Sequence, residues 1–179
     1  GCGLVRRDEG KASLTLPYLG GDGCQDKKFI TDANSGSNTS EAEGSQATSA
    51  PDATKLSSAQ QFYQEFSQAY ANKPAPYNDA KNEPYSPFGF DAMNILIQAI
   101  KSVLLANNGQ PPADTQTFRD QIVQQLHSVQ YDGAVGHTSF DQNGDTTNPF
   151  FTLYKVSGGT WVGVNAYSVD SSGNVTVKS

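Results

Sequence analysis

The chain has 179 residues, a formal net charge of −6 and 36% hydrophobic residues. This length suits one ordinary domain with a sizeable core. Because 18 acidic residues oppose 12 basic ones and no basic run exceeds two residues, we expect no nucleic-acid partner, since phosphate binding needs clustered positive charge. Eight Tyr, nine Phe and one Trp need burial, which argues against a disordered chain.

The longest apolar tracts lie in residues 92–106, where several polar side chains interrupt them. We therefore predict no membrane span. Gly1-Cys2-Gly3 is compatible with the end of a lipoprotein signal, in which the cysteine carries the lipid, although no apolar segment precedes it in the sequence. A lipid anchor on Cys2 is thus an open alternative to an ordinary cysteine.

The first third of the chain alternates helix and strand patterns. Residues 4–12 favour a short helix, and Leu16–Leu19 predicts a brief buried strand that ends at Gly20–Gly23. A further short helix is expected around Phe29-Ile30. A strand followed by a glycine turn and a helix indicates an α/β protein.

Another helix pattern begins at Ser57 or Ser58, either of which can cap it, and runs over about 58–71. Its aromatic side chains recur at helical spacing, which is typical of a core-facing stripe. Residues 73–87 contain four prolines, so we predict a loop there.

Two more helices follow, and each has a candidate capping residue. Asp91 can cap a helix over 91–106 with a broad apolar face, and Asp114 or Thr115 can cap a helix over 115–128. The period then changes to that of strands. We predict hairpins at 140–156 and 151–164, and a last strand at 175–177 after a turn at 171–174.

Asp22 is the first candidate site residue, because it follows a predicted strand. Open α/β sheets bind ligands at the carboxyl ends of their strands, and a carboxylate there suits a cationic group such as an ammonium. The alternative is a turn aspartate that bonds its own backbone. The surrounding glycines lack the lysine of a phosphate loop, and the acid would repel phosphate.

No metal site, cofactor or catalytic centre is expected. Asp141–Asp145 resembles a calcium loop, but Thr146 and Thr152 stand where that loop needs Gly and Glu, so an Asn-Gly turn is the better prediction. His127 and His137 lie on different predicted elements and outside any metal motif. Without a nucleophile-elbow sequence either, we predict that the protein is not an enzyme.

Six segments between about Leu4 and Val164 together resemble the second half of a type I periplasmic binding protein of the branched-chain amino-acid receptor group, which serves ABC importers. In chain order they are Leu16–Gly23 with Phe29-Ile30, Ala42–Gly44, Phe62–Tyr70, Pro87–Ile100, Tyr131–Asp145 and Phe151–Val164. Within the fourth, Phe90 stands where the family usually has tyrosine.

This resemblance implies an α/β fold with Rossmann-like lobes, of which the chain carries the C-terminal half and pieces of both lobes. Residues 1–52 would belong to lobe two with the ligand-side turn at 20–23, and residues 56–148 to lobe one. Residues 149–179 would return to lobe two and form the tail. The N-terminal half of the receptor would be a missing partner.

The resemblance also implies a function. The chain would be part of an extracytoplasmic solute-binding receptor that captures an amino acid or similar zwitterion by cleft closure and delivers it to an ABC permease. Asp22 would pair with the ligand's ammonium, and Tyr85 and Phe88 would line the cleft wall. The alternatives are a ligand-binding sensor domain of a regulatory protein and an incomplete fragment that binds no solute.

Cys2 and Cys24 allow one disulfide, with two buried free thiols as the alternative. Cys2 starts the first predicted helix and Cys24 follows the glycine turn, so both are expected at the same edge of one sheet. An exported receptor meets an oxidising compartment, which favours the bridge.

Overall fold

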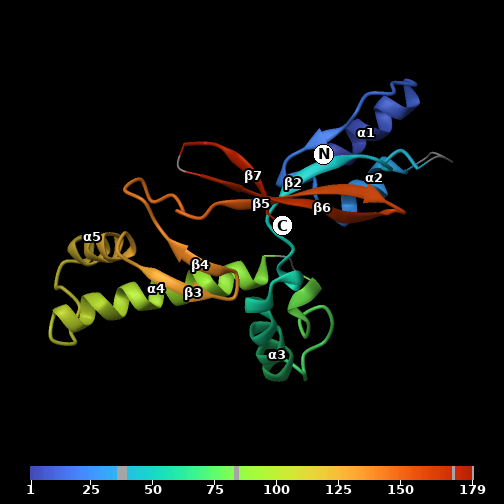
Figure 1. The fold of residues 1–179 in the computed structure, drawn as a ribbon. Helices are drawn as coiled ribbons and strands as arrows, with labels where there is room; N and C mark the ends of the chain where they lie inside the picture. The colour runs from blue at the N-terminus through green and yellow to red at the C-terminus, as the bar shows by residue number, and fades with distance from the viewer. Residues whose placement is uncertain (36–39, 83–84, 171, 179) are drawn as a thin grey trace. The chain divides into compact units, whose positions relative to one another are not determined.

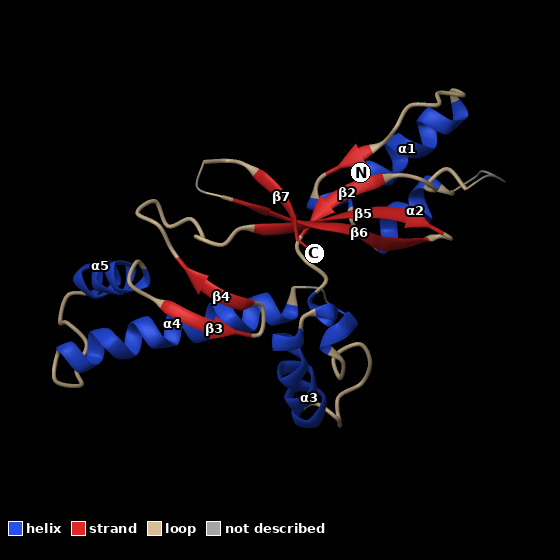
Figure 2. Cartoon of the chain, in the orientation of Figure 1, coloured by secondary structure: helices blue, strands red, loops and turns tan. Residues whose placement is uncertain are grey.

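The computed structural model describes residues 1–35, 40–82, 85–170 and 172–178. Residues 83–84 of the predicted proline-rich loop and residue 171 of the predicted turn lie outside this range. The chain divides into two compact units, which we call unit 1 (residues 1–51 and 150–179) and unit 2 (residues 52–149). Figure 1 traces both along the chain, and Figure 2 shows their helices and strands.

Unit 1 is built on a five-stranded sheet of order β1-β2-β5-β6-β7. Its strands are β1 (Leu19–Gly20), β2 (Gln46–Ser49), β5 (Phe150–Ser157), β6 (Thr160–Val169) and β7 (Val175–Lys178). β1 and β2 are parallel, whereas the other neighbours are antiparallel. The two helices α1 (Cys2–Lys11) and α2 (Lys27–Ala33) pack on each other.

The core of unit 1 centres on Phe29 of α2. Its ring lies 5.3 Å from that of Tyr18 and 5.2 Å from that of Trp161, measured between centroids. Asp26 caps α2 by accepting a hydrogen bond from the Phe29 amide, and its own carbonyl accepts one from Trp161 Nε1 at 2.8 Å. Helix α2 is thereby attached to the sheet through β6.

Unit 2 contains three helices and one hairpin among its described residues. They are α3 (Gln60–Ala69), α4 (Ser86–Ala106), α5 (Thr115–Leu126), β3 (Gln130–Gly133) and β4 (Gly136–Ser139), with 3₁₀ turns η2 (Ala53–Lys55), η3 (Ser57–Ala59) and η4 (Ala80–Asn82). α5 packs against α4. Figure 1 shows the β3–β4 hairpin beside the first part of α4. A cluster around Phe62 and Tyr63 of α3 forms the core.

Asp91 lies inside α4, so the prediction that it caps this helix is wrong. Pro87 continues a helix that starts at Ser86, since proline is tolerated in the first turn. The Asp91 side chain is 2% exposed and accepts hydrogen bonds from the amides of Ala134 (2.9 Å) and Val135 (2.7 Å). It thus binds the β3–β4 turn to α4.

Two other local predictions are wrong. Leu16–Leu19 is not a buried strand, because β1 has only two residues at the edge of the sheet and Leu16 and Leu19 are 59% and 69% exposed. The 140–156 hairpin does not form, because β4 pairs with β3 and β5 pairs with β2 and β6. The 141–145 turn itself is present, closed by a hydrogen bond that the Asp141 amide donates to the Asp145 carbonyl.

The remaining helix and hairpin predictions are confirmed within a few residues. η3 and α3 together cover most of 58–71, although Ser58 Oγ donates to the Ala134 carbonyl and does not cap the helix. Asp114 caps α5 by accepting hydrogen bonds from the amide and the hydroxyl of Thr117, both at 2.7 Å. These two hydrogen bonds lower the pKa of the Asp114 carboxyl group. The 151–164 hairpin is formed by β5 and β6.

α4 is long and apolar enough to cross a membrane by length and composition, which the interrupted sequence did not predict. Its most apolar stretch has a mean hydropathy of 1.4, and 22% of that stretch is buried. Core helices of soluble proteins meet the same criterion, so this is weak evidence for a membrane location.

Candidate functional site

The candidate site is the turn that follows β1. Because β1 and β2 are parallel, their carboxyl ends lie at one edge of the sheet. Gly21 leads from β1 into the 3₁₀ turn η1 (Asp22–Cys24), which contacts β2. This is the position at which open α/β sheets bind their ligands.

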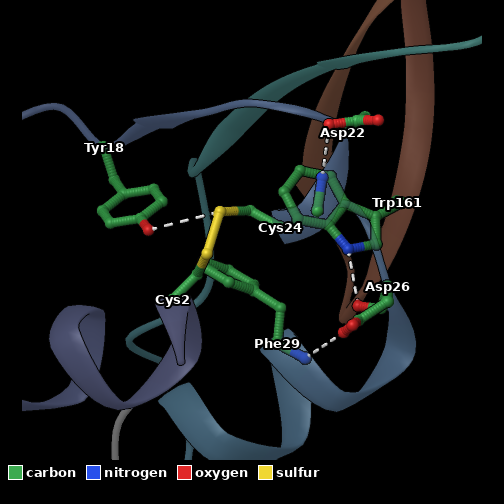
Figure 3. Close-up of a disulfide and its surroundings, with 8 residues drawn as sticks. Cys2, Tyr18, Asp22, Cys24, Asp26, Phe29 and Trp161 are labelled. Atoms are coloured by element: carbon green, nitrogen blue, oxygen red, sulfur yellow. Dashed lines mark hydrogen bonds between the residues drawn. A yellow bond between two sulfur atoms is a disulfide. The ribbon is translucent and has the colours of Figure 1, made fainter.

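Asp22 is exposed, and its Oδ1 accepts a hydrogen bond from the Gly23 amide at 2.8 Å. Figure 3 shows the side chain directed away from the disulfide. The local bond is the one expected of a turn aspartate, but it uses one carboxylate oxygen. Within the described part of the chain, no donor is recorded for Oδ2. A bound ammonium could therefore approach without breaking the turn.

A disulfide joins Cys2 at the start of α1 to Cys24 at the end of η1, with a Cα–Cα distance of 5.6 Å. Gly20 makes room for it, because a Cβ there would lie 2.7 Å from Cys24 Cβ. The Tyr18 hydroxyl donates to Cys24 Sγ at 3.8 Å, as Figure 3 shows. Burial and, less strongly, Glu9 raise the pKa of Tyr18, which keeps the hydroxyl protonated as a donor.

Hydroxyl groups at the same sheet edge were not found by sequence reasoning. Ser49 ends β2, is buried, and stands opposite buried Thr152 of β5 in the antiparallel register. Tyr154, two residues further along β5, donates its hydroxyl to the Ala50 carbonyl at 2.9 Å. The period-2 pattern of 150–157 could have placed Thr152 and Tyr154 on one face, but pairing with β2 could not be read from it.

Tyr85 and Phe88 lie in unit 2, whereas Asp22 lies in unit 1. Tyr85 immediately precedes α4 and is 49% exposed, and the half-buried Phe88 lies in the first turn of that helix, with 6.3 Å between the two ring centroids. The structure thus brings these two aromatic residues together.

Two pockets of unit 2 are lined by other residues. One of about 330 Å³ is bordered by Tyr63, Asp79 and Lys81, whose ammonium lies 5.6 Å from the centre of the Tyr63 ring. The other, of about 250 Å³, lies between Leu126 and Phe140. None of the proposed ligand-binding residues lines either pocket.

The described residues contain no cluster of three or more His, Cys, Asp or Glu side chains that could hold a metal ion. Asp141 Oδ1 instead accepts from the amides of Asn143 and Asp145, which stabilises the turn. His127 Nδ1 lies 3.0 Å from the Asp141 carbonyl, and His137 Nδ1 lies 2.7 Å from Asp132 Oδ1. These contacts account for both imidazoles structurally.

Comparison with known proteins identifies the fold. The family described as "Receptor family ligand binding region" matches residues 28–159. The chain therefore belongs to this receptor family, whose fold is that of the type I periplasmic binding proteins. The α/β fold class and the family resemblance expected from the sequence are both confirmed. A search of curated proteins found no match.

Solved structures of similar fold include a leucine-binding protein and two binding proteins of branched-chain amino-acid transporters. A leucine-binding protein from Thermotoga maritima has 20% identity and a TM-score of 0.64, with 96% of this chain and 42% of that chain covered. An isoleucine complex from Streptococcus pneumoniae has 19% identity and a TM-score of 0.57, covering 91% and 42%. A valine-bound protein from Thermus thermophilus has 15% identity and a TM-score of 0.55, covering 94% and 43%. The chain thus spans about two fifths of these relatives.

Proposed function

We propose that this chain is part of a solute-binding receptor of an ABC importer, and that its ligand is an amino acid or similar zwitterion. The main support is the position of Asp22 at the carboxyl end of a parallel strand pair, in a chain of this receptor family. One oxygen of its carboxylate accepts the Gly23 amide, and the other is available to a ligand. Three solved structures of similar fold are described as complexes with leucine, valine and isoleucine. Binding and release need no bond-making chemistry, so the proposed protein is not an enzyme.

In the proposed receptor, unit 1 belongs to lobe two and unit 2 to lobe one. The division of the chain near residues 51 and 150 supports this assignment. Asp22 would bind the ligand's ammonium, while Tyr85 and Phe88 would line the cleft wall. A further polypeptide, corresponding to the part of the relatives that has no counterpart here, would complete both lobes.

The proposed location is outside the cytoplasm, where such a receptor hands its ligand to a membrane permease. The disulfide supports this location, because disulfides persist in oxidising compartments. A lipid on Cys2 is excluded in the bridged form, since the same sulfur cannot carry both. A regulatory sensor domain is the second candidate, because the same fold can serve that role. An effector segment in the parent gene would favour it.

Asp22→Asn, made in the receptor that contains this chain, is expected to weaken amino-acid binding by about 1.5–3 kcal/mol, because a charge-assisted hydrogen bond is lost. Isothermal calorimetry with leucine, isoleucine and valine measures the change. Asp145→Asn removes the same charge from an exposed turn and serves as the control. Equal affinity of the Asp22→Asn variant and the wild type would exclude the ammonium-binding role.

The 179-residue chain by itself is expected to bind these amino acids weakly or undetectably, because partners for the ligand carboxylate would lie mostly in the complementing polypeptide. Calorimetry of the isolated chain tests this expectation. A tight complex with the isolated chain would show that the site is complete without a further polypeptide.

A further inference from the structure

The Asp22 turn, η1, is closed by hydrogen bonds among its own residues. The Cys24 amide donates to the Gly21 carbonyl at 3.0 Å, and the Gly23 amide donates to Asp22 Oδ1 at 2.8 Å. These local bonds fix the shape of the turn and the Asp22 side chain within it. They do not fix where the turn lies on the rest of unit 1, because donor and acceptor move together.

Two glycines make this segment flexible unless another part of the fold holds it. Gly21 and Gly23 flank Asp22, and a Cβ placed at either one would have no atom within 4 Å among the described residues beyond its chain neighbours. Glycine also loses more backbone freedom on folding than any other residue. An attachment outside the turn is therefore needed to hold the Asp22 carboxylate at one position.

Cys24 supplies that attachment, as Figure 3 shows. Its sulfur is bonded to Cys2 at the start of α1, and it accepts a hydrogen bond from the Tyr18 hydroxyl at 3.8 Å. A Cβ at Gly20 would lie 2.7 Å from Cys24 Cβ, so Cys24 also rests against the end of β1. Cys2 packs against the core cluster that contains Phe29. The disulfide thus joins the turn to a helix and to the core of unit 1.

The Asp22 side chain is directed away from the disulfide, as Figure 3 shows, and Asp22 lies two residues before Cys24. Any effect of the bridge on Asp22 must therefore pass through the backbone of the turn. We propose that Cys2 and Cys24 are positioning residues, whose disulfide holds Asp22 where its carboxylate meets the ligand's ammonium. A binding group that is held in place beforehand lowers the ordering cost of binding. The inference rests on the proposed function for the role of Asp22, whereas the ordering of the turn involves no ligand.

The first test measures how far the bridge and Asp22 depend on each other. The receptor that contains this chain is compared as the wild type, Asp22→Asn, Cys2→Ser/Cys24→Ser and the triple variant, by calorimetry with leucine, isoleucine and valine. The double serine variant is expected to bind about threefold to tenfold more weakly than the wild type, because its turn has to be ordered on binding. Asp22→Asn should then weaken binding less in the double serine background than in the bridged receptor.

The outcomes separate this inference from the proposed function. If Asp22→Asn leaves the affinity of the bridged receptor unchanged, Asp22 does not bind the ammonium, and both are overturned. If Asp22→Asn weakens binding by the same factor with and without the bridge, the positioning role alone is overturned. Equal affinity of the double serine variant and the wild type would also overturn the positioning role alone.

Val156→Ala is the matched control for a loss of stability. It opens a cavity in the core of unit 1, where Val156 is fully buried, and leaves the disulfide in place. At a temperature where every variant is folded, this variant should bind as tightly as the wild type. A loss of affinity equal to that of the double serine variant would show that the bridge acts through stability and not through the position of Asp22.

The second test needs no ligand. Hydrogen exchange of a peptide that covers residues 19–26, measured by mass spectrometry, reports on local opening of the turn. Exchange should be about threefold to tenfold faster in the double serine variant than in the wild type, which corresponds to the ordering cost expected in binding. Exchange in residues 150–157 should stay the same, because β5 lies in the sheet. Equal exchange of the 19–26 peptide in both proteins would show that the turn is ordered without the bridge and would overturn the positioning role.

Discussion

Asp91→Ala is expected to lower the free energy of unfolding of unit 2 by about 2–4 kcal/mol, because a buried amide left without an acceptor costs about 1–3 kcal/mol and a half-buried one costs less. The two amides concerned are those of Ala134 and Val135. The loss would free the β3–β4 turn from α4. The measurement is urea unfolding followed by far-ultraviolet circular dichroism. This signal reports mainly on unit 2, because α3, α4 and α5 contain most of the helical residues.

Two further variants make this prediction specific. Asp91→Asn should also destabilise, because its amide group turns one acceptor into a donor that faces a backbone amide. Gln98→Ala, on the exposed face of the same helix, should change the free energy of unfolding by less than about 0.5 kcal/mol. If Asp91→Ala were as mild as Gln98→Ala, the two backbone hydrogen bonds would not hold the turn.

Gly133 belongs to the same contact for a steric reason. A Cβ at this position would lie 2.4 Å from Asp91 Oδ2 and 2.3 Å from Tyr131 Cε1. Burial, and then the nearby Asp91 charge, raise the pKa of Tyr131, which fits a carboxylate close to a ring that is held away from water. The glycine therefore allows the close approach of the turn on which the two hydrogen bonds depend.

Removal of the Cys2–Cys24 bridge is expected to destabilise unit 1 by about 2–4 kcal/mol, because the unfolded chain regains the freedom of a 22-residue separation. The fluorescence of Trp161 is the probe, since this tryptophan packs on Phe29 beside the disulfide and the sequence contains no other. We expect the unfolding transition to move to lower urea concentration in the Cys2→Ser/Cys24→Ser variant and in the reduced wild type.

The control is the response to reductant. The double serine variant has no bridge to reduce, so reductant should leave its transition unchanged while it shifts that of the wild type. Titration of the denatured, non-reduced wild type should detect no free thiol, and two after reduction. Two reactive thiols before reduction would rule the bridge out.

Local patterns in the sequence predicted those elements whose residues contact one another nearby in the chain. Asp114 predicts the start of α5, because a capping side chain bonds an amide three residues away. Ser157-Gly158-Gly159 predicts the β5–β6 turn, because a tight turn joins adjacent antiparallel strands. Cys24 could be placed near Asp22 because the two residues are separated by a single residue in the chain.

Tertiary contacts decided the role of Asp91, the strand pairing and the burial of α4. Periodicity shows which side chains are apolar, but it does not show which other residues cover them. The sequence around Asp91 predicts a helix cap. In the structure its buried carboxylate instead accepts hydrogen bonds from the amides of Ala134 and Val135, which are 43 and 44 residues away in the chain. Strand β5 pairs with β2 about a hundred residues earlier, which no turn signal encodes, and this pairing sets Thr152 opposite Ser49 at the carboxyl end of β2. The broad apolar face of α4 is present in the sequence, but only the packing of α5 and the β3–β4 turn shows that Ile95 and Val103 are buried while Met93 and Ile97 stay exposed.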